Sequence, residues 1–155
     1  MSVHRISRSF FARFGGIVPV ALLAGAAPAN ADMKTHKIAI QVSENDTGTM
    51  NLALNNVANL AQYYSGNGQL WSIEVVAYGP GLHMLRADDS PVRDRLHAIK
   101  QSINDVTFSA CANTMKGMEK AEGHPIAIVA DARIVPAGVV RLAELQEQGY
   151  SYIKP

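Results

Sequence analysis

The sequence predicts an α/β protein in which helices cover both faces of a parallel β-sheet. Short apolar segments alternate with amphipathic helical segments along most of the chain. The short segments are apolar on both faces, which is typical of strands buried inside a parallel sheet. With 155 residues, of which 48% are apolar and 17% charged, the chain is expected to form one globular domain with its own core.

The N-terminal segment has a different composition from the rest of the chain. Residues 1–13 carry three arginines and no acidic residue, residues 15–27 are apolar or small, and residues 29–31 read Ala-Asn-Ala. A basic start, a short apolar run and a small-x-small cleavage site are, in this order, typical of a secretory signal peptide. We therefore expect residues 1–31 to be a signal peptide and residues 32–155 to be a single exported, periplasmic domain.

The charge of that mature domain argues against a nucleic-acid partner. Loss of three arginines leaves 11 basic against 13 acidic residues, so the formal charge changes from +1 to −2. No basic patch remains, and the aromatic residues are few and scattered.

The first strand and helix of the mature chain follow directly from the apolar pattern. Residues 37–42 predict a buried strand, and residues 43–48 form a polar turn. Three residues are candidate caps for the helix that follows: Asp46, Thr47 and Thr49. Its core-facing residues recur at helical spacing: Ala53, Val57, Leu60, Ala61 and Tyr64. The glycine-rich segment 65–68 ends the helix.

A second strand and two further helices are expected next. Residues 71–77 predict the strand, and residues 81–87 a short helix. Ser90 and Pro91 are a typical helix opening, with serine as the cap and proline at the first helical position. The helix after them has one apolar face: Val92, Leu96, Ile99 and Ile103.

The last part of the chain predicts three strands and two helices. Residues 106–110 are a short apolar strand, and residues 112–123 favour a helix. Residues 126–130 are an apolar run that predicts the fourth strand, and residues 150–154 predict the fifth. Between these two strands a helix over residues 138–148 is expected to turn three apolar side chains inward: Val139, Leu142 and Leu145.

Cys111, the only cysteine, falls at a turn from strand to helix. The free amides and the dipole of a helix N-terminus favour an anion there and lower the pKa of a thiol. A lone cysteine can equally be a small buried hydrophobic residue. It has no partner in the chain for a disulfide, so in an exported protein it is free, modified or bonded to another molecule.

Three loops are expected to meet near this cysteine, because ligands of open parallel sheets bind beyond the carboxyl ends of the strands. They are residues 43–48, residues 78–81 and the turn that holds Cys111. Their polar residues are candidate neighbours of the thiol: Asn45, Asp46, Tyr78 and His83. Asn113 and Thr114 could donate hydrogen bonds to a bound anion from the first turn of the helix, or act only as local caps.

Four segments together resemble the DsrE/DsrF-like family of small sulfur-relay proteins. The resemblance covers residues 37–155. The first two matching segments are the strand 38–42 with its long following helix and the Ala-Tyr-Gly-Pro-Gly of residues 77–81. The other two are the Phe-Ser-Ala-Cys-Ala-Asn-Thr-Met of residues 108–115 and the tail 136–150, which contains Leu-Gln-x-x-Gly-Tyr. It implies a three-layer α/β/α fold with a five-stranded parallel sheet, of flavodoxin-like architecture, assembled as a homotrimer or homohexamer. It also implies that a cysteine carries persulfide sulfur between partners, a role that only Cys111 can take.

Two functional hypotheses follow. In the first, the Cys111 thiolate accepts sulfane sulfur from a protein or small thiol and passes it on, with ligand contacts from Asn45, Tyr78, His83, Asn113 and Thr114. In the second, the chain is a non-catalytic oligomer that binds a soft metal such as Cu(I) or a small ligand, and the thiol is incidental. Cys111, Met115 and Met118 share a helical spacing that suits Cu(I), although methionines at this spacing more often fill a core.

No resident cofactor or metal site is expected from the remaining motifs. The Gly-Asn-Gly of residues 66–68 follows a helix and precedes a strand, which is the reverse of a phosphate-binding loop, so neither NAD nor ATP is indicated.

Overall fold

The structure is a computed structural model that describes residues 35–155. The signal peptide predicted for residues 1–31 lies outside the described residues. No helix in the described part of the chain is long and apolar enough to cross a membrane.

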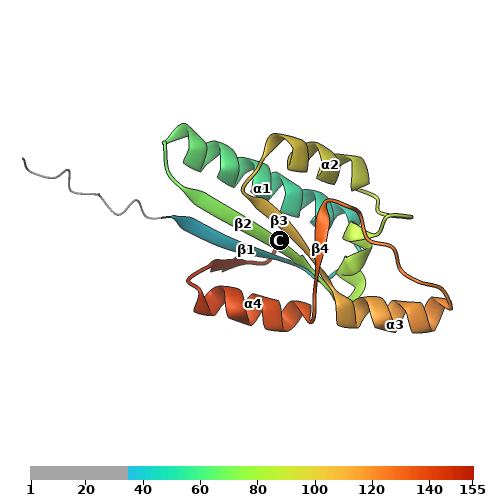
Figure 1. Cartoon of the computed structure of the whole chain (residues 1–155). Coiled ribbons are helices and arrows are strands. Elements are labelled where there is room, and N and C mark those ends of the chain that lie inside the picture. The colour runs from blue at the N-terminus through green and yellow to red at the C-terminus, as the bar shows by residue number, and fades with distance from the viewer. Residues whose placement is uncertain (1–34) are drawn as a thin grey trace, which may run out of the picture. The chain divides into compact units, whose positions relative to one another are not determined.

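Five parallel strands form the sheet, as the sequence predicted. They are β1 (His36–Val42), β2 (Trp71–Ala77), β3 (Val106–Cys111), β4 (Ala132–Val135) and β5 (Ser151–Ile153). The strand order is β4-β3-β2-β1-β5, and every neighbouring pair is parallel. The carboxyl ends of the strands therefore share one edge of the sheet (Figure 1).

Helices cover both faces of this sheet, which confirms the three-layer architecture (Figure 1). One face carries α1 (Thr47–Gly66), α2 (Arg93–Ser102) and the 3₁₀-helix η1 (Gly79–Leu85), and the opposite face carries α4 (Gly138–Glu147). The remaining helix, α3 (Ala112–Glu122), continues from β3 beyond the carboxyl edge. Asp46 caps α1 as predicted: its Oδ1 accepts a hydrogen bond from the Thr49 amide at 2.6 Å.

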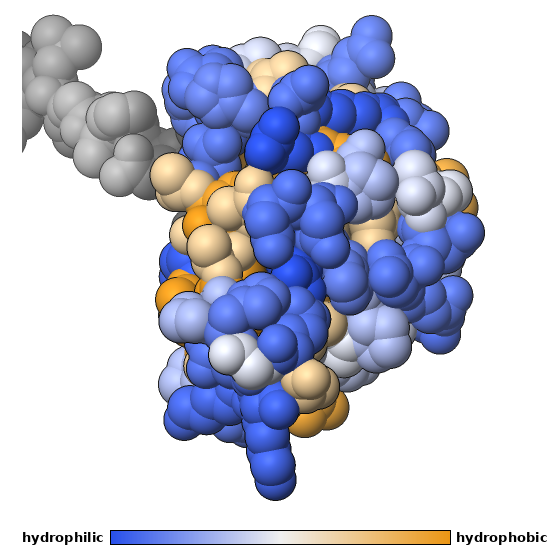
Figure 2. All heavy atoms as spheres, turned by 90° about the vertical axis from the view of Figure 1, so that its right-hand side faces the viewer, coloured by the Kyte–Doolittle hydropathy of each residue, from blue (hydrophilic) through white to orange (hydrophobic). Residues whose placement is uncertain are grey.

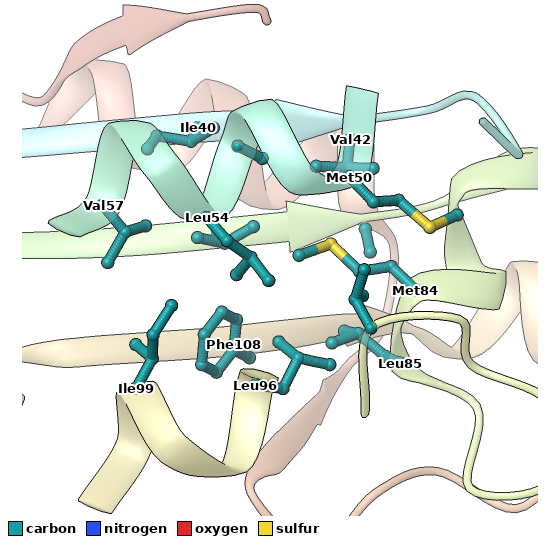
Figure 3. Close-up of a cluster of buried hydrophobic side chains, with 14 of the residues drawn as sticks. Ile40, Val42, Met50, Leu54, Val57, Met84, Leu85, Leu96, Ile99 and Phe108 are labelled. Atoms are coloured by element: carbon teal, nitrogen blue, oxygen red, sulfur yellow. The ribbon is translucent and has the colours of Figure 1, made fainter. Parts of the chain in front are cut away.

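The main core lies between the sheet and the helices α1, α2 and η1. Phe108 of β3 is fully buried, and it is surrounded by aliphatic residues of the helices and strands (Figure 3). A second and smaller core lies under the other face, between β1, β2 and α4: Ala39, Val76, Leu142 and Leu145. The two faces of the sheet are thus covered unequally.

The fourth strand was predicted in the wrong place. Residues 126–130 do not enter the sheet; the segment runs antiparallel to the end of η1. The Ala87 amide donates to the Ala127 carbonyl, and the Val129 amide donates to the Leu85 carbonyl, both at 2.9 Å. Packing there buries Ile126 and Val129, so the apolar run has a core role outside the sheet.

Two predictions on helix faces and ends are also wrong. Val139 is 63% exposed, because the inward stripe of α4 begins one residue earlier, at Gly138, and continues through Leu142 and Leu145. Ser90 does not cap α2, which begins at Arg93; its hydroxyl instead donates to the Met84 carbonyl at 2.5 Å and so closes the end of η1.

Candidate functional site

The ends of four strands come together at the carboxyl edge of the sheet. Val42 pairs with Ala77, Ala77 pairs with Ala110, and Cys111 pairs with Val135. The loops after β1, β2 and β3 therefore meet as expected. The β4–α4 connection joins them, and it was not foreseen because the strand before it was misplaced.

Cys111 is both the last residue of β3 and the N-cap of α3. Its Sγ accepts a hydrogen bond from the Thr114 amide at 3.4 Å. The amides of Asn113, on α3, and Gly138, the first residue of α4, also act on the sulfur. The sulfur is therefore held between the N-termini of two helices, where backbone N–H groups favour a negative charge.

Two effects act on the pKa of the Cys111 thiol in opposite directions. Burial raises the pKa, and it is the largest single influence. Hydrogen bonds from Thr114, from the Gly138 amide and from the Asn113 amide lower it, and together they prevail. The pKa of the thiol is therefore below its ordinary value, which increases the thiolate fraction near neutral pH.

The thiol is nearly covered. Cys111 is only 4% exposed, so a reactant reaches the sulfur only after a small opening of the residues around it. The helix that it caps is the least embedded of the structure, since none of the residues of α3, all of which lie in the described part of the chain, is buried. The surface beyond the carboxyl edge is mostly hydrophilic, with apolar side chains gathered in a few patches (Figure 2).

Thr114 links the cysteine turn to the loop after β2. Its Oγ1 accepts a hydrogen bond from the Gly79 amide at 2.9 Å. Gly79 has a φ of 53°, a left-handed conformation that favours glycine. Tyr78, just before it, packs against the start of α4 so closely that a Cβ at Gly138 would lie 2.7 Å from the Tyr78 Cβ. This contact positions the Gly138 amide beside the sulfur.

The side chains of the other predicted ligand residues make no hydrogen bond to the sulfur within the described part of the chain. Asn45 is exposed in the loop after β1, and Asn113 offers its backbone amide while the residue itself is exposed. His83 is half-buried on η1, and its Nδ1 lies 3.3 Å from Asp89 Oδ2. It therefore belongs to a charged cluster around Arg86.

That cluster connects η1 to the far end of α3. Arg86 is 4% exposed and contacts three carboxylates, those of Asp88, Asp89 and Glu122. The Arg86 guanidinium donates to Glu122 through Nη1 at 2.6 Å and through Nη2 at 3.0 Å. Hydrogen bonds from Arg86 hold the pKa of Glu122 below its usual value, so the pair persists to a lower pH than an isolated glutamate would allow.

A buried charge network under the sheet was not predicted. Glu74 of β2 is 3% exposed, and its carboxylate accepts hydrogen bonds from Arg141, Arg133 and Ser109, each at 2.7–2.8 Å. Burial raises the pKa of Glu74, but these bonds outweigh burial and lower it. The only sequence signal was one acidic residue inside an otherwise apolar strand, which gives no indication of its partners.

No group of three or more His, Cys, Asp or Glu side chains that could hold a metal ion occurs within residues 35–155. Met115 and Met118, the two residues that would share a soft metal with Cys111, are partly buried and pack against the main core.

The comparisons with known proteins agree with this fold. The sequence model of the DsrE/DsrF-like family matches residues 36–155. A solved protein of unknown function, MTH1491 from Methanobacterium thermoautotrophicum, is similar in structure with a TM-score of 0.62 and 29% sequence identity. The similarity covers 77% of this chain and 99% of that one. No curated protein matches the sequence.

Proposed function

We propose that this chain, which belongs to the DsrE/DsrF-like family, carries persulfide sulfur on Cys111 between partner proteins or small sulfur compounds. Family membership indicates a role in sulfur relay in general terms. The observation that supports the finer proposal is the placement of the only thiol between the N-termini of α3 and α4, where amides lower its pKa.

The proposed step needs no cofactor. The Cys111 thiolate attacks the outer sulfur of a sulfane donor, and a bond forms between Sγ and that sulfur. The bond between the outer sulfur and the rest of the donor breaks, and the leaving group takes the electron pair. The persulfide anion that results is stabilised by the same amides that stabilise the thiolate, and an acceptor thiolate removes the outer sulfur in a second step of the same kind.

The proposed setting is the periplasm, and the proposed form is a homo-oligomer. Export follows from the expected signal peptide over residues 1–31, and assembly as a trimer or hexamer follows from the resemblance to the family. The donor and acceptor would then act outside the cytoplasm. Cu(I) binding has no comparable support, because Met115 and Met118 already pack against the core.

The intact mass of the protein purified from its own compartment, before and after reduction, tests both the cleavage of the signal peptide and the presence of sulfur on Cys111. We expect a chain that begins at Asp32 and carries an extra sulfur atom that reductant removes. The Cys111→Ser variant is the matched control: serine is a favoured N-cap, so the fold is kept while the nucleophile is lost. A wild-type protein that never acquires sulfur, even after incubation with a sulfane donor, would contradict the proposal, and bound copper in the native-state mass would favour the metal alternative.

A further inference from the structure

A groove with a volume of about 210 Å³ lies next to the cysteine turn, between the end of β4 and the first turns of α4. Two arginines, Arg133 and Arg141, line it together with the backbone of residues 135–137. Val140 forms an apolar part of the wall, and Glu144 lies at its side. A cavity of this size fits a small molecule rather than a macromolecule.

The groove and the thiol share one edge of the sheet. Cys111 pairs directly with Val135, a residue of the groove, and neighbouring strands are separated by about 5 Å. The Gly138 amide, which stabilises the sulfur, immediately follows the groove residue Ala137. Arg133 contacts the same strand as the thiol, because its Nε donates to Ser109 Oγ at 3.0 Å. The groove thus lies beside the end of the strand that carries the sulfur, although Cys111 itself is not one of its lining residues.

Both guanidiniums of this region are paired with a carboxylate, and one of them keeps a nitrogen that bonds no group within residues 35–155. Arg141 binds Glu74 in a bidentate pair, with Nε on Oε1 and Nη2 on Oε2, both at 2.8 Å. The same carboxylate also accepts a hydrogen bond from Arg133 Nη2 at 2.8 Å, so both arginines contact it. Arg133 is 49% exposed and uses Nε and Nη2, while its Nη1 makes no hydrogen bond within the described part of the chain. The opposing carboxylate, Glu144, is half exposed and lies 3.3 Å from Arg141.

We propose that this groove binds the anionic group of a small sulfane-sulfur compound and that Arg133 is its main contact. The proposal rests on the function proposed for Cys111 and names the class of donor that serves it. With thiosulfate, the Cys111 thiolate attacks the outer sulfur, the bond between the two sulfur atoms of thiosulfate breaks, and sulfite leaves with the electron pair. With a persulfide of glutathione, a carboxylate occupies the groove and the glutathione thiolate leaves.

The rates at which two alkylating agents of similar size react with Cys111 test whether the groove attracts an anion, without any sulfur transfer. Iodoacetate is an anion and iodoacetamide is neutral, so the ratio of their rates at Cys111 reports local attraction for an anion. We expect Arg133→Gln to slow iodoacetate by about threefold to tenfold, the range for loss of one nearby charge in a partly solvated site, and to change the iodoacetamide rate by less than about twofold. Arg93→Gln removes an exposed arginine on α2 and is expected to change neither rate.

Two more variants keep the test decisive. Glu144→Gln removes the opposing carboxylate and should accelerate alkylation by iodoacetate but not by iodoacetamide. Arg133→Lys keeps the positive charge, so it should retain most of the iodoacetate rate even if glutamine at this position unfolds the domain. An unchanged ratio in folded Arg133→Gln, with no effect of Glu144→Gln, would overturn the subsite.

Sulfur loading then separates this inference from the function on which it rests. In wild type, loading from thiosulfate, from glutathione persulfide or from both identifies the source of the anion, and each rate is expected to fall in Arg133→Gln. Loading that is unaffected by Arg133→Gln would overturn the subsite and leave the proposed function intact. A variant-sensitive alkylation ratio without any loading would keep the anion subsite and contradict the sulfur-carrier function.

Discussion

At Cys111, burial and hydrogen bonding act in opposite directions on one sulfur atom. Burial alone would keep the thiol protonated, and an exposed thiol alone would be open to oxidation. The structure combines a nearly covered sulfur with backbone amides from α3 and α4 that favour its anion. Such a site suits a thiolate that must be reactive toward a chosen partner and protected from other oxidants.

The hydroxyl of Thr114 is the side chain best placed to test this balance. Thr114→Val keeps the shape of the residue but removes the hydroxyl that helps to lower the pKa of Cys111 and that accepts from the Gly79 amide. The pKa of the thiol should rise, so the thiolate fraction at neutral pH should fall. We expect alkylation by iodoacetamide at pH 7 to slow by about threefold to tenfold, the effect of one hydrogen bond of ordinary strength, and its pH profile to shift to higher pH.

Thr107→Val, on the strand β3 that ends at Cys111, is the control for replacement of threonine by valine. It should leave the pH profile of alkylation unchanged. An equal shift in both variants, or none in Thr114→Val, would mean that the backbone amides alone determine the state of the sulfur.

Among the secondary-structure elements around the sulfur, α3 is the one that we expect to move most easily. None of its residues, all within the described part of the chain, is buried, and its two ends are attached differently. At its N-terminal end Thr114 binds the Gly79 amide, and at its C-terminal end Glu122 binds the buried Arg86. We therefore expect an opening at the cysteine to involve a movement of α3 relative to η1.

Loosening the far end of α3 should expose the thiol. In Glu122→Gln the charge that pairs with Arg86 is lost, while every amide around Cys111 remains. We expect alkylation at neutral pH to become faster by about threefold or more, because a weaker attachment raises the population of open states, with little change in the pH profile. The control is Glu147→Gln, an exposed position at the end of α4.

The attachment of α3 to η1 through the Glu122–Arg86 pair should depend on pH. The pKa of Glu122 is lower in the folded chain than its usual value. Its contribution to stability is therefore fully present at a pH above the usual pKa of glutamate, and it is lost as the pH falls through the pKa of the folded state. The wild type at sufficiently acidic pH should therefore approach the fast alkylation of Glu122→Gln, after correction for the thiolate fraction. Equal rates in the variant and the wild type across the whole pH range would contradict this role of the pair.

The elements also show what a sequence can and cannot predict. Local patterns were sufficient for the helices, for most strands and for the position of Cys111, because β3 passes directly into α3 at this residue. The run 126–130 was misread, since an apolar segment buried against η1 has the same composition as a strand. Gly138 and the partners of Glu74 were missed because they depend on contacts between segments distant in sequence, which no local spacing encodes.

On the scale of the whole domain, the two faces of the sheet are unequally covered. Three helical elements bury one face, whereas α4 alone covers the other, and the larger of the two cores lies on the first side. On the outer side of α4 two consecutive valines, Val139 and Val140, are 63% and 52% exposed. We propose that Val139 of this pair is part of the surface that an assembly covers.

Assembly with further copies of the chain is expected to cover Val139, whereas Val140 lines the groove beside the cysteine turn. Burial of a valine side chain stabilises an interface by about 1.5 kcal/mol or more, and a charge in its place would be buried without a partner. Val139→Glu should therefore convert a trimer or hexamer of the mature domain into monomers. The control is Leu52→Glu, at an exposed position on α1, which should keep the assembly. Light scattering coupled to size-exclusion chromatography measures the mass of both variants. The rate of iodoacetamide alkylation measured on the same samples distinguishes two kinds of assembly. A faster rate in the Val139→Glu monomer would show that a neighbouring copy helps to cover Cys111, and an assembly that survives in Val139→Glu would place the interface on another surface.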